Sequence, residues 1–162
     1  MEQTTIQHQP SNTATSTALP QVAAYSPLVI HRHSPLVTFL LYLWVLPATL
    51  FGLVVVGLTA VTGGSVQCYA GAIEAWSGIA VWIFKYITRP GCAMTLGHVI
   101  IGLDEYSICR YRQHEHVHIE QYERWGPLFV PLYVASSLLA WVEGKNIYHD
   151  NVFEQEAYRR CH

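Results

Sequence analysis

Two histidines and a glutamate lie close together in the last third of the chain, in the run His114-Glu115-His116-Val117-His118. On an α-helix, residues four apart differ by about 40° around the axis, so His114 and His118 share one face. Two imidazoles on one face can bind one tetrahedral zinc ion. Glu115, offset by about 100° from His114, would lie beside the metal. The spacing therefore predicts a Zn²⁺ site in which Glu115 takes a proton from zinc-bound water.

A catalytic zinc site needs a third protein ligand, and the same helix does not supply it. Its later glutamates, Glu120 and Glu123, lie about 240° and 180° around the axis from the first histidine, away from its face. The remaining candidates lie in residues 150–159, which look helical. Glu154 and Glu156 point about 160° apart on such a helix, so only one of them can reach the metal.

The two blocks together resemble the membrane-bound gluzincin metallopeptidases, which carry H-E-x-x-H on one helix and E-x-x-A on a later helix. Prenyl-protein peptidases and bacterial membrane heat-shock peptidases have this arrangement, and small bacterial membrane proteins with a D-N-x-F-E-x-E-A tail are also similar. The segment Phe153–Tyr158 aligns with the F-E-x-x-A-D of the family, so the resemblance implies that Glu154 is the third zinc ligand. Tyr158 stands where the family has an aspartate that supports a ligand histidine, and its hydroxyl can accept the same hydrogen bond.

The resemblance implies a membrane-anchored zinc metallopeptidase that hydrolyses peptide bonds with zinc-bound water activated by Glu115. Its substrates would be peptides or proteins, including membrane-associated ones, and its location the inner (plasma) membrane of a bacterium. Two alternatives stay open. One is a catalytically inactive zincin-like membrane protein that binds a metal or a partner. The other is a membrane assembly protein whose histidines are surface residues.

Four other side chains are candidates for a part in the site. His149 precedes the second block and could steady a transition-state oxyanion, as could Tyr122 or Tyr148. His98 lies in a predicted hairpin, where it could line the substrate site or have no function. His116 points about 160° away from His118 and is expected at the surface.

Composition points to a membrane and excludes nucleic acid as a partner. Hydrophobic residues make up 51% of the chain and charged residues 12%, well below the usual share. Residues 1–103 carry 5 of the 20 charged side chains and residues 104–162 carry 15. A net charge of -2 leaves no basic surface to neutralise phosphates. The apolar part is therefore predicted to contact membrane lipid.

The charge-poor first part of the chain consists of a polar tail followed by one long apolar run. Residues 1–34 are mostly Gln, Thr, Ser, Ala and Pro and are predicted to form a disordered tail. No charged residue occurs between Arg32 and Glu74, and Leu36–Val61 is almost wholly aliphatic or aromatic. About 20 apolar residues cross the hydrocarbon core, so residues 35–62 are predicted to be a transmembrane helix with Pro47 near its middle.

Residues 63–162 are predicted to form a compact zincin-like domain, and the fold class is mainly α with a small β element (α+β). Its predicted elements are a strand within 66–76, a helix over 77–87, a strand or hairpin over 92–102, and a helix from Asp104 to Trp125. The apolar stretch 128–142 is about 22 Å long as a helix, too short for a hydrocarbon core of about 30 Å. It is predicted to be an interfacial, re-entrant or core helix that returns Glu154 to the site.

Overall fold

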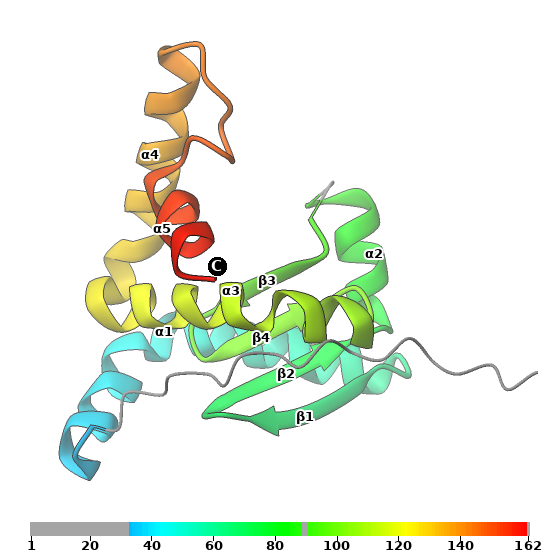
Figure 1. Ribbon diagram of the computed structural model, residues 1–162. Helices are drawn as coiled ribbons and strands as arrows, with labels where there is room; N and C mark the ends of the chain where they lie inside the picture. The colour runs from blue at the N-terminus through cyan, green and yellow to red at the C-terminus, as the bar shows by residue number, and fades with distance from the viewer. Residues whose placement is uncertain (1–32, 89–90, 162) are drawn as a thin grey trace, which may run out of the picture.

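The computed structural model describes residues 33–88 and 91–161. The helices are α1 (Pro35–Val61), α2 (Ile79–Tyr86), α3 (Glu105–Trp125), α4 (Phe129–Val142) and α5 (Val152–Arg160), and the short 3-10 helix η1 (Gly126–Leu128) joins α3 to α4. The strands are β1 (Ser65–Tyr69), β2 (Ala72–Trp76), β3 (Ala93–Leu96) and β4 (Val99–Gly102). The chain is mainly helical with one small sheet in its described part, which confirms the α+β prediction (Figure 1). Almost all of the predicted tail, residues 1–32, lies outside the described residues.

The four strands form one sheet in the order β1-β2-β4-β3. The central pair, β2 and β4, is parallel, and both outer pairs are antiparallel hairpins. The sequence predicted a short strand within 66–76, and the structure has two strands there, because Ala70 and Gly71 adopt positive φ angles of 51° and 86° and reverse the chain between them. The predicted hairpin over 92–102 is confirmed, with Gly97 in its turn.

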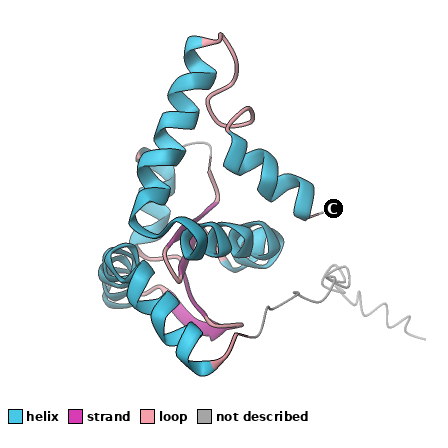
Figure 2. Ribbon diagram, turned by 90° about the vertical axis from the view of Figure 1, so that its left-hand side faces the viewer, coloured by secondary structure: helices cyan, strands magenta, loops and turns pink. Residues whose placement is uncertain are grey.

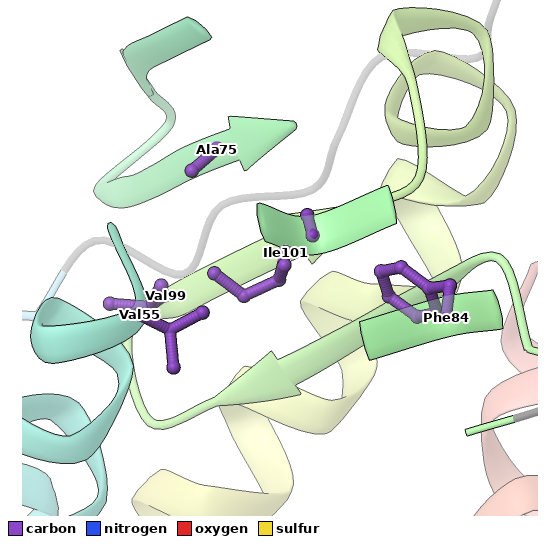
Figure 3. Close-up of a cluster of buried hydrophobic side chains, with 6 residues drawn as sticks. Val55, Ala75, Phe84, Val99 and Ile101 are labelled. Atoms are coloured by element: carbon purple, nitrogen blue, oxygen red, sulfur yellow. The ribbon is translucent and has the colours of Figure 1, made fainter. Parts of the chain in front are cut away.

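Strand β4 is buried on both faces and holds the layers together. Alternate residues of a strand point to opposite faces. Val99 and Ile101 therefore pack against α1 and α2, with Val55 and Phe84 (Figure 3). Ile100 points the other way, into a cluster with residues of α3. The sheet thus lies between α1 and α2 on one face and α3 on the other (Figure 1).

Helix α1 covers almost the whole of the predicted transmembrane segment and continues through Pro47. One stripe of it is buried against the rest of the chain: Val45, Thr49, Gly52, Val55 and Thr59. Its other faces expose large apolar side chains such as Phe39, Phe51 and Leu58. The sequence predicted a boundary between the transmembrane segment 35–62 and the domain 63–162. In the structure, α1 forms a layer of the domain as well as an apolar outer surface.

Within residues 33–88 and 91–161, two helical segments are long and apolar enough to cross a membrane, Pro35–Val61 and Glu105–Val142. The second combines α3, η1 and α4, and all seven of its charged residues lie before Trp125. The chain also turns sharply between α3 and α4 (Figure 1). Of these two segments, α1 therefore has the length, the composition and the single direction along the chain that the sequence predicted for a membrane helix.

Helix α3 is fixed at its start and along its sheet face. The carboxylate of Asp104 accepts a hydrogen bond from the backbone N–H of Ser107, as expected for an N-cap. Glu74 on β2 is fully buried and accepts two hydrogen bonds from the Arg112 guanidinium, at 2.7 and 2.9 Å. A buried charge needs such a partner, so this ion pair sets how α3 lies on the sheet.

Helix α4 leads away from α3, and a loop then returns the chain to α5 (Figure 2). Only Phe129 and Ala140 of its 14 residues are buried, so the core-helix alternative for residues 128–142 is wrong. The predicted return of Glu154 is confirmed. Asn151 caps α5, and its amide nitrogen donates to the Tyr133 carbonyl and the Ser137 hydroxyl of α4. These bonds fix where α5 begins.

Two glycines of α1 test how that helix packs. A Cβ at Gly52 would lie 2.8 Å from the Val99 Cβ and 2.9 Å from the Leu96 carbonyl oxygen, whereas a Cβ at Gly57 meets nothing within 4 Å. Gly52→Ala should lower the free energy of unfolding by about 1–3 kcal/mol through overpacking. Gly57→Ala should raise it by up to about 1 kcal/mol through helix propensity. Thermal unfolding in detergent micelles measures both, and equal shifts would contradict the packing of α1 on the sheet.

Candidate metal centre

The structure brings together the three predicted ligands, His114 and His118 from α3 and Glu154 from α5. All three residues are buried, and their ligand atoms lie within 4.8 Å of one another. The two Nε2 atoms are 3.1 Å apart. Glu154 Oε2 lies 3.1 Å from His114 Nε2, and Glu154 Oε1 lies 3.4 Å from His118 Nε2. The three donors therefore converge on one point.

The spacing and chemistry of these donors fit a zinc ion. Ligands about 2.0–2.1 Å from a tetrahedral ion lie roughly 3.3 Å from one another. The two Nε2 atoms are 3.1 Å apart, and each lies at 3.1 or 3.4 Å from a different oxygen of Glu154. Glu154 Oε2 is buried and has no hydrogen-bond partner among the described residues, although His114 lies within ion-pair distance. A second buried carboxyl group, that of Glu115, lies beside the cluster. A divalent cation would balance both negative charges.

The protein groups alone already favour an ionised carboxylate. Burial acts to raise the pKa of Glu154, but the His114 and His118 imidazoles and the Tyr133 hydroxyl beside the carboxylate outweigh burial and hold that pKa far below its usual range. Burial likewise acts to lower the pKa of His118, and the nearby Glu154 and Glu115 raise it to about 9. The Glu154 carboxylate therefore stabilises positive charge beside it, either on an imidazole or on a bound cation.

Glu115 lies beside the three candidate ligands and points toward β3. Its Oε2 accepts a hydrogen bond of 2.7 Å from the Thr95 hydroxyl. Burial raises the pKa of Glu115, while His118, His114 and the Thr95 hydrogen bond partly offset that rise. A carboxyl group with a raised pKa can both accept and return a proton near neutral pH.

Three residues that contact the site were missed from the sequence. Tyr133 of α4 donates a hydrogen bond of 2.7 Å to Glu154 Oε1, and Thr95 of β3 holds Glu115. Gln121 of α3 lies 2.8 Å from His118 Nδ1. Only Gln121 had a local signal, since it follows His118 by three residues and so lies on the same side of the helix. The other two come from elements whose position depends on the whole fold.

The two predicted supporting residues lie at the edge of the site. Tyr158 packs its ring on that of His114, with centroids 4.7 Å apart, and its hydroxyl donates to Tyr148 rather than supporting a ligand nitrogen. His149 is exposed and contacts Tyr158, so one ring separates it from His114. Of the other candidate oxyanion donors, Tyr148 has its pKa raised first by burial and then by its neighbours Tyr158 and Glu154. Tyr122 is buried in an apolar cluster with Phe129.

The remaining histidines have structural surroundings of their own. His98 is buried in the β3–β4 turn, where it stacks on Tyr42 of α1 and lies 3.2 Å from Glu123 of α3. It does not line the candidate site, and its contacts join α1 to α3. The expectation that His116 lies at the surface was wrong, because its Nε2 is buried and burial lowers its pKa. His116 faces the side of α3 that holds Arg112.

The two glutamates of α5 should differ in their effect on zinc binding. Glu154 faces the histidines, whereas Glu156 accepts hydrogen bonds from Gln121 and Arg124 outside the pocket. Glu154→Ala should therefore lose stoichiometric zinc, as should His114→Ala and His118→Ala, because three protein ligands are the minimum for this type of site. Glu156→Ala should keep it. Metal analysis of the purified proteins measures this, and zinc retained in Glu154→Ala would exclude Glu154 as a ligand.

The geometry therefore describes a buried His-His-Glu cluster able to hold a metal ion, with a further carboxylate beside it. A role for that cluster must be argued from its own chemistry. Comparisons with protein-family models, with curated proteins and with solved structures found no match for this chain.

Proposed function

We propose that the chain is a membrane-anchored zinc metallopeptidase of zincin-like architecture. The observation that carries the proposal is the position of Glu115, a buried carboxyl group next to three converging donors and hydrogen-bonded to the neighbouring strand. A structural metal site needs four protein ligands and no adjacent base. Three donors and a separate carboxyl group are instead the set that metal-assisted hydrolysis uses.

His114, His118 and Glu154 would hold the zinc ion. The bound ion would polarise the substrate carbonyl and lower the pKa of the attacking water. Glu115 accepts the proton of that water as its oxygen bonds to the carbonyl carbon, and it then gives the proton to the amide nitrogen as the C–N bond breaks. Thr95 orients Glu115 for both transfers through its 2.7 Å hydrogen bond. Tyr133 holds the Glu154 carboxylate toward the histidines.

Strand β3 supports a peptide as the substrate class. It pairs with β4 along one side, and no strand of the described chain pairs with its other side. An extended peptide can add to such a free edge through backbone hydrogen bonds. Thr95, which contacts Glu115, belongs to this strand, and Glu115 directly follows the candidate ligand His114 on α3. A peptide lying along β3 would therefore pass beside the candidate ligands.

Helix α1 supports anchoring in a membrane. It is 27 residues long, about 40 Å by the rise of an α-helix, which is enough for a tilted or bent crossing. Its exposed faces are aliphatic and aromatic, a surface that water would not favour. The apolar, largely exposed α4 supports contact of the site region with the same lipid. The bacterial inner membrane as its location is part of this proposal.

Replacing Glu115 with Gln separates metal binding from turnover. The variant keeps the size and the helix propensity of the side chain but removes the proton acceptor. Zinc content should stay stoichiometric while cleavage of a peptide library falls by about 10²–10⁴-fold. Digestion in detergent micelles, read by mass spectrometry, measures the products. Glu105→Gln, an exposed glutamate in the first turn of the same helix, is the matched control and should cleave like the wild type.

Two outcomes would contradict the proposal. Equal cleavage by the wild type and Glu115→Gln would show that another group, or a contaminant, hydrolyses the peptides. A wild type that binds zinc through these residues and cleaves no peptide would favour the inactive zincin-like binding protein instead.

A further inference from the structure

Gln121 is a fully buried polar side chain that contacts one candidate ligand without being a ligand itself. We propose that Gln121 is the positioning residue of the zinc site: its amide fixes His118 in the tautomer that turns a lone pair toward the metal. The inference rests on the proposed zinc site and adds the group that orients one of its ligands. The argument follows from which atoms of Gln121 can donate and which can accept.

The amide nitrogen of Gln121 donates hydrogen bonds to two acceptors, and these fix the orientation of the amide. Nε2 lies 3.0 Å from the Phe153 carbonyl oxygen and 3.0 Å from Glu156 Oε2. A carbonyl and an ionised carboxylate accept hydrogen bonds and do not donate them. The two N–H groups must therefore face α5, because the flipped amide would place an oxygen against two oxygens. Arg124 also donates to the Glu156 carboxylate and keeps it ionised beside Gln121.

This orientation determines the proton position on His118. With its nitrogen directed to α5, Gln121 presents Oε1 to His118 Nδ1 at 2.8 Å. An amide oxygen can only accept, so Nδ1 must carry the proton. In the neutral ring, Nε2 is then unprotonated, and Nε2 is the atom that faces His114 and Glu154. The hydrogen-bond network thus selects the ligand form of the imidazole.

The same amide also links the two helices that supply the ligands. Gln121 follows His118 by one helical turn on α3, and its acceptor Phe153 directly precedes Glu154 on α5. The distance between the histidine pair and the carboxylate therefore depends on this bridge. Support for a ligand histidine comes here from a neutral amide on the histidine helix, whereas the resembling family uses an aspartate at the position of Tyr158.

Zinc affinity and imidazole NMR of the full-length protein in detergent test the inference. Gln121→Met fills a similar volume but offers no acceptor, and it should weaken zinc binding by about 10–100-fold in competition with a chelator. Gln121→Glu keeps an acceptor oxygen for Nδ1 but loses the donors to Phe153 and Glu156, so it should retain the Nδ1–H of His118. In ¹H–¹⁵N spectra of the zinc-loaded protein, a slowly exchanging Nδ1–H of His118 should be present in the wild type and lost in Gln121→Met.

The matched control is Glu120→Gln. Glu120 also connects α3 to α5, through a 2.6 Å ion pair with Arg160, but it touches no candidate ligand. Its zinc affinity should equal that of the wild type. Unchanged affinity in Gln121→Met, or an equal loss in Glu120→Gln, would overturn the inference and leave the metallopeptidase proposal standing. Absence of zinc binding by the wild type would overturn both.

Discussion

The burial of the Glu154 carboxylate between two histidines is the constraint on which the C-terminal half of the chain depends. An isolated carboxylate in such a place would be protonated or excluded, so its neighbours must supply donors or a cation. Two imidazoles and the Tyr133 hydroxyl surround it. Because Tyr133 belongs to α4, the position of α4 helps to hold the Glu154 carboxylate, although most of that helix is exposed. The Asn151 cap then sets the rotation of α5 that aims Glu154 inward.

Helix α3 packs against the sheet on one face and against α5 on the other, and the two faces carry different kinds of residue. On the sheet side, Arg112 and the fully buried Glu74 form an ion pair that tolerates little displacement. On the opposite side, His114 and His118 face α5. Glu115 lies between these two sides and reaches the edge strand through Thr95. A helix fixed by charge on one face can therefore carry the candidate chemistry on the other with little freedom to move.

The parts of this arrangement that sequence reasoning recovered are those governed by local rules. The Asp104 cap, the i, i+4 histidine pair and the Asn151 cap each involve residues within one helical turn, and each lies where it was expected. The turn at Ala70 and Gly71 was missed because its left-handed backbone lacks the usual Asn-Gly signal.

Long-range placement could not be derived from local pattern. Thr95 and Tyr133 reach the site only because β3 and α4 are packed where they are, and nothing in their neighbouring residues indicates a partner. The same reason explains why His116 was expected at the surface, since helical angles alone do not say what lies opposite each face. The zinc ligands were proposed from spacing and resemblance, and their convergence depends on the docking of two helices distant in sequence.

The stacking of His98 on Tyr42 shows that α1 is an integral part of the folded domain. His98 contacts Tyr42 and Thr49 of α1 on one side and Glu123 of α3 on the other, and Val55 of α1 completes the core beneath the sheet. Removal of α1 to obtain a water-soluble fragment would expose β4 and unfold the layer that supports α3. The apolar helix and the candidate site therefore have to be expressed and studied as one unit.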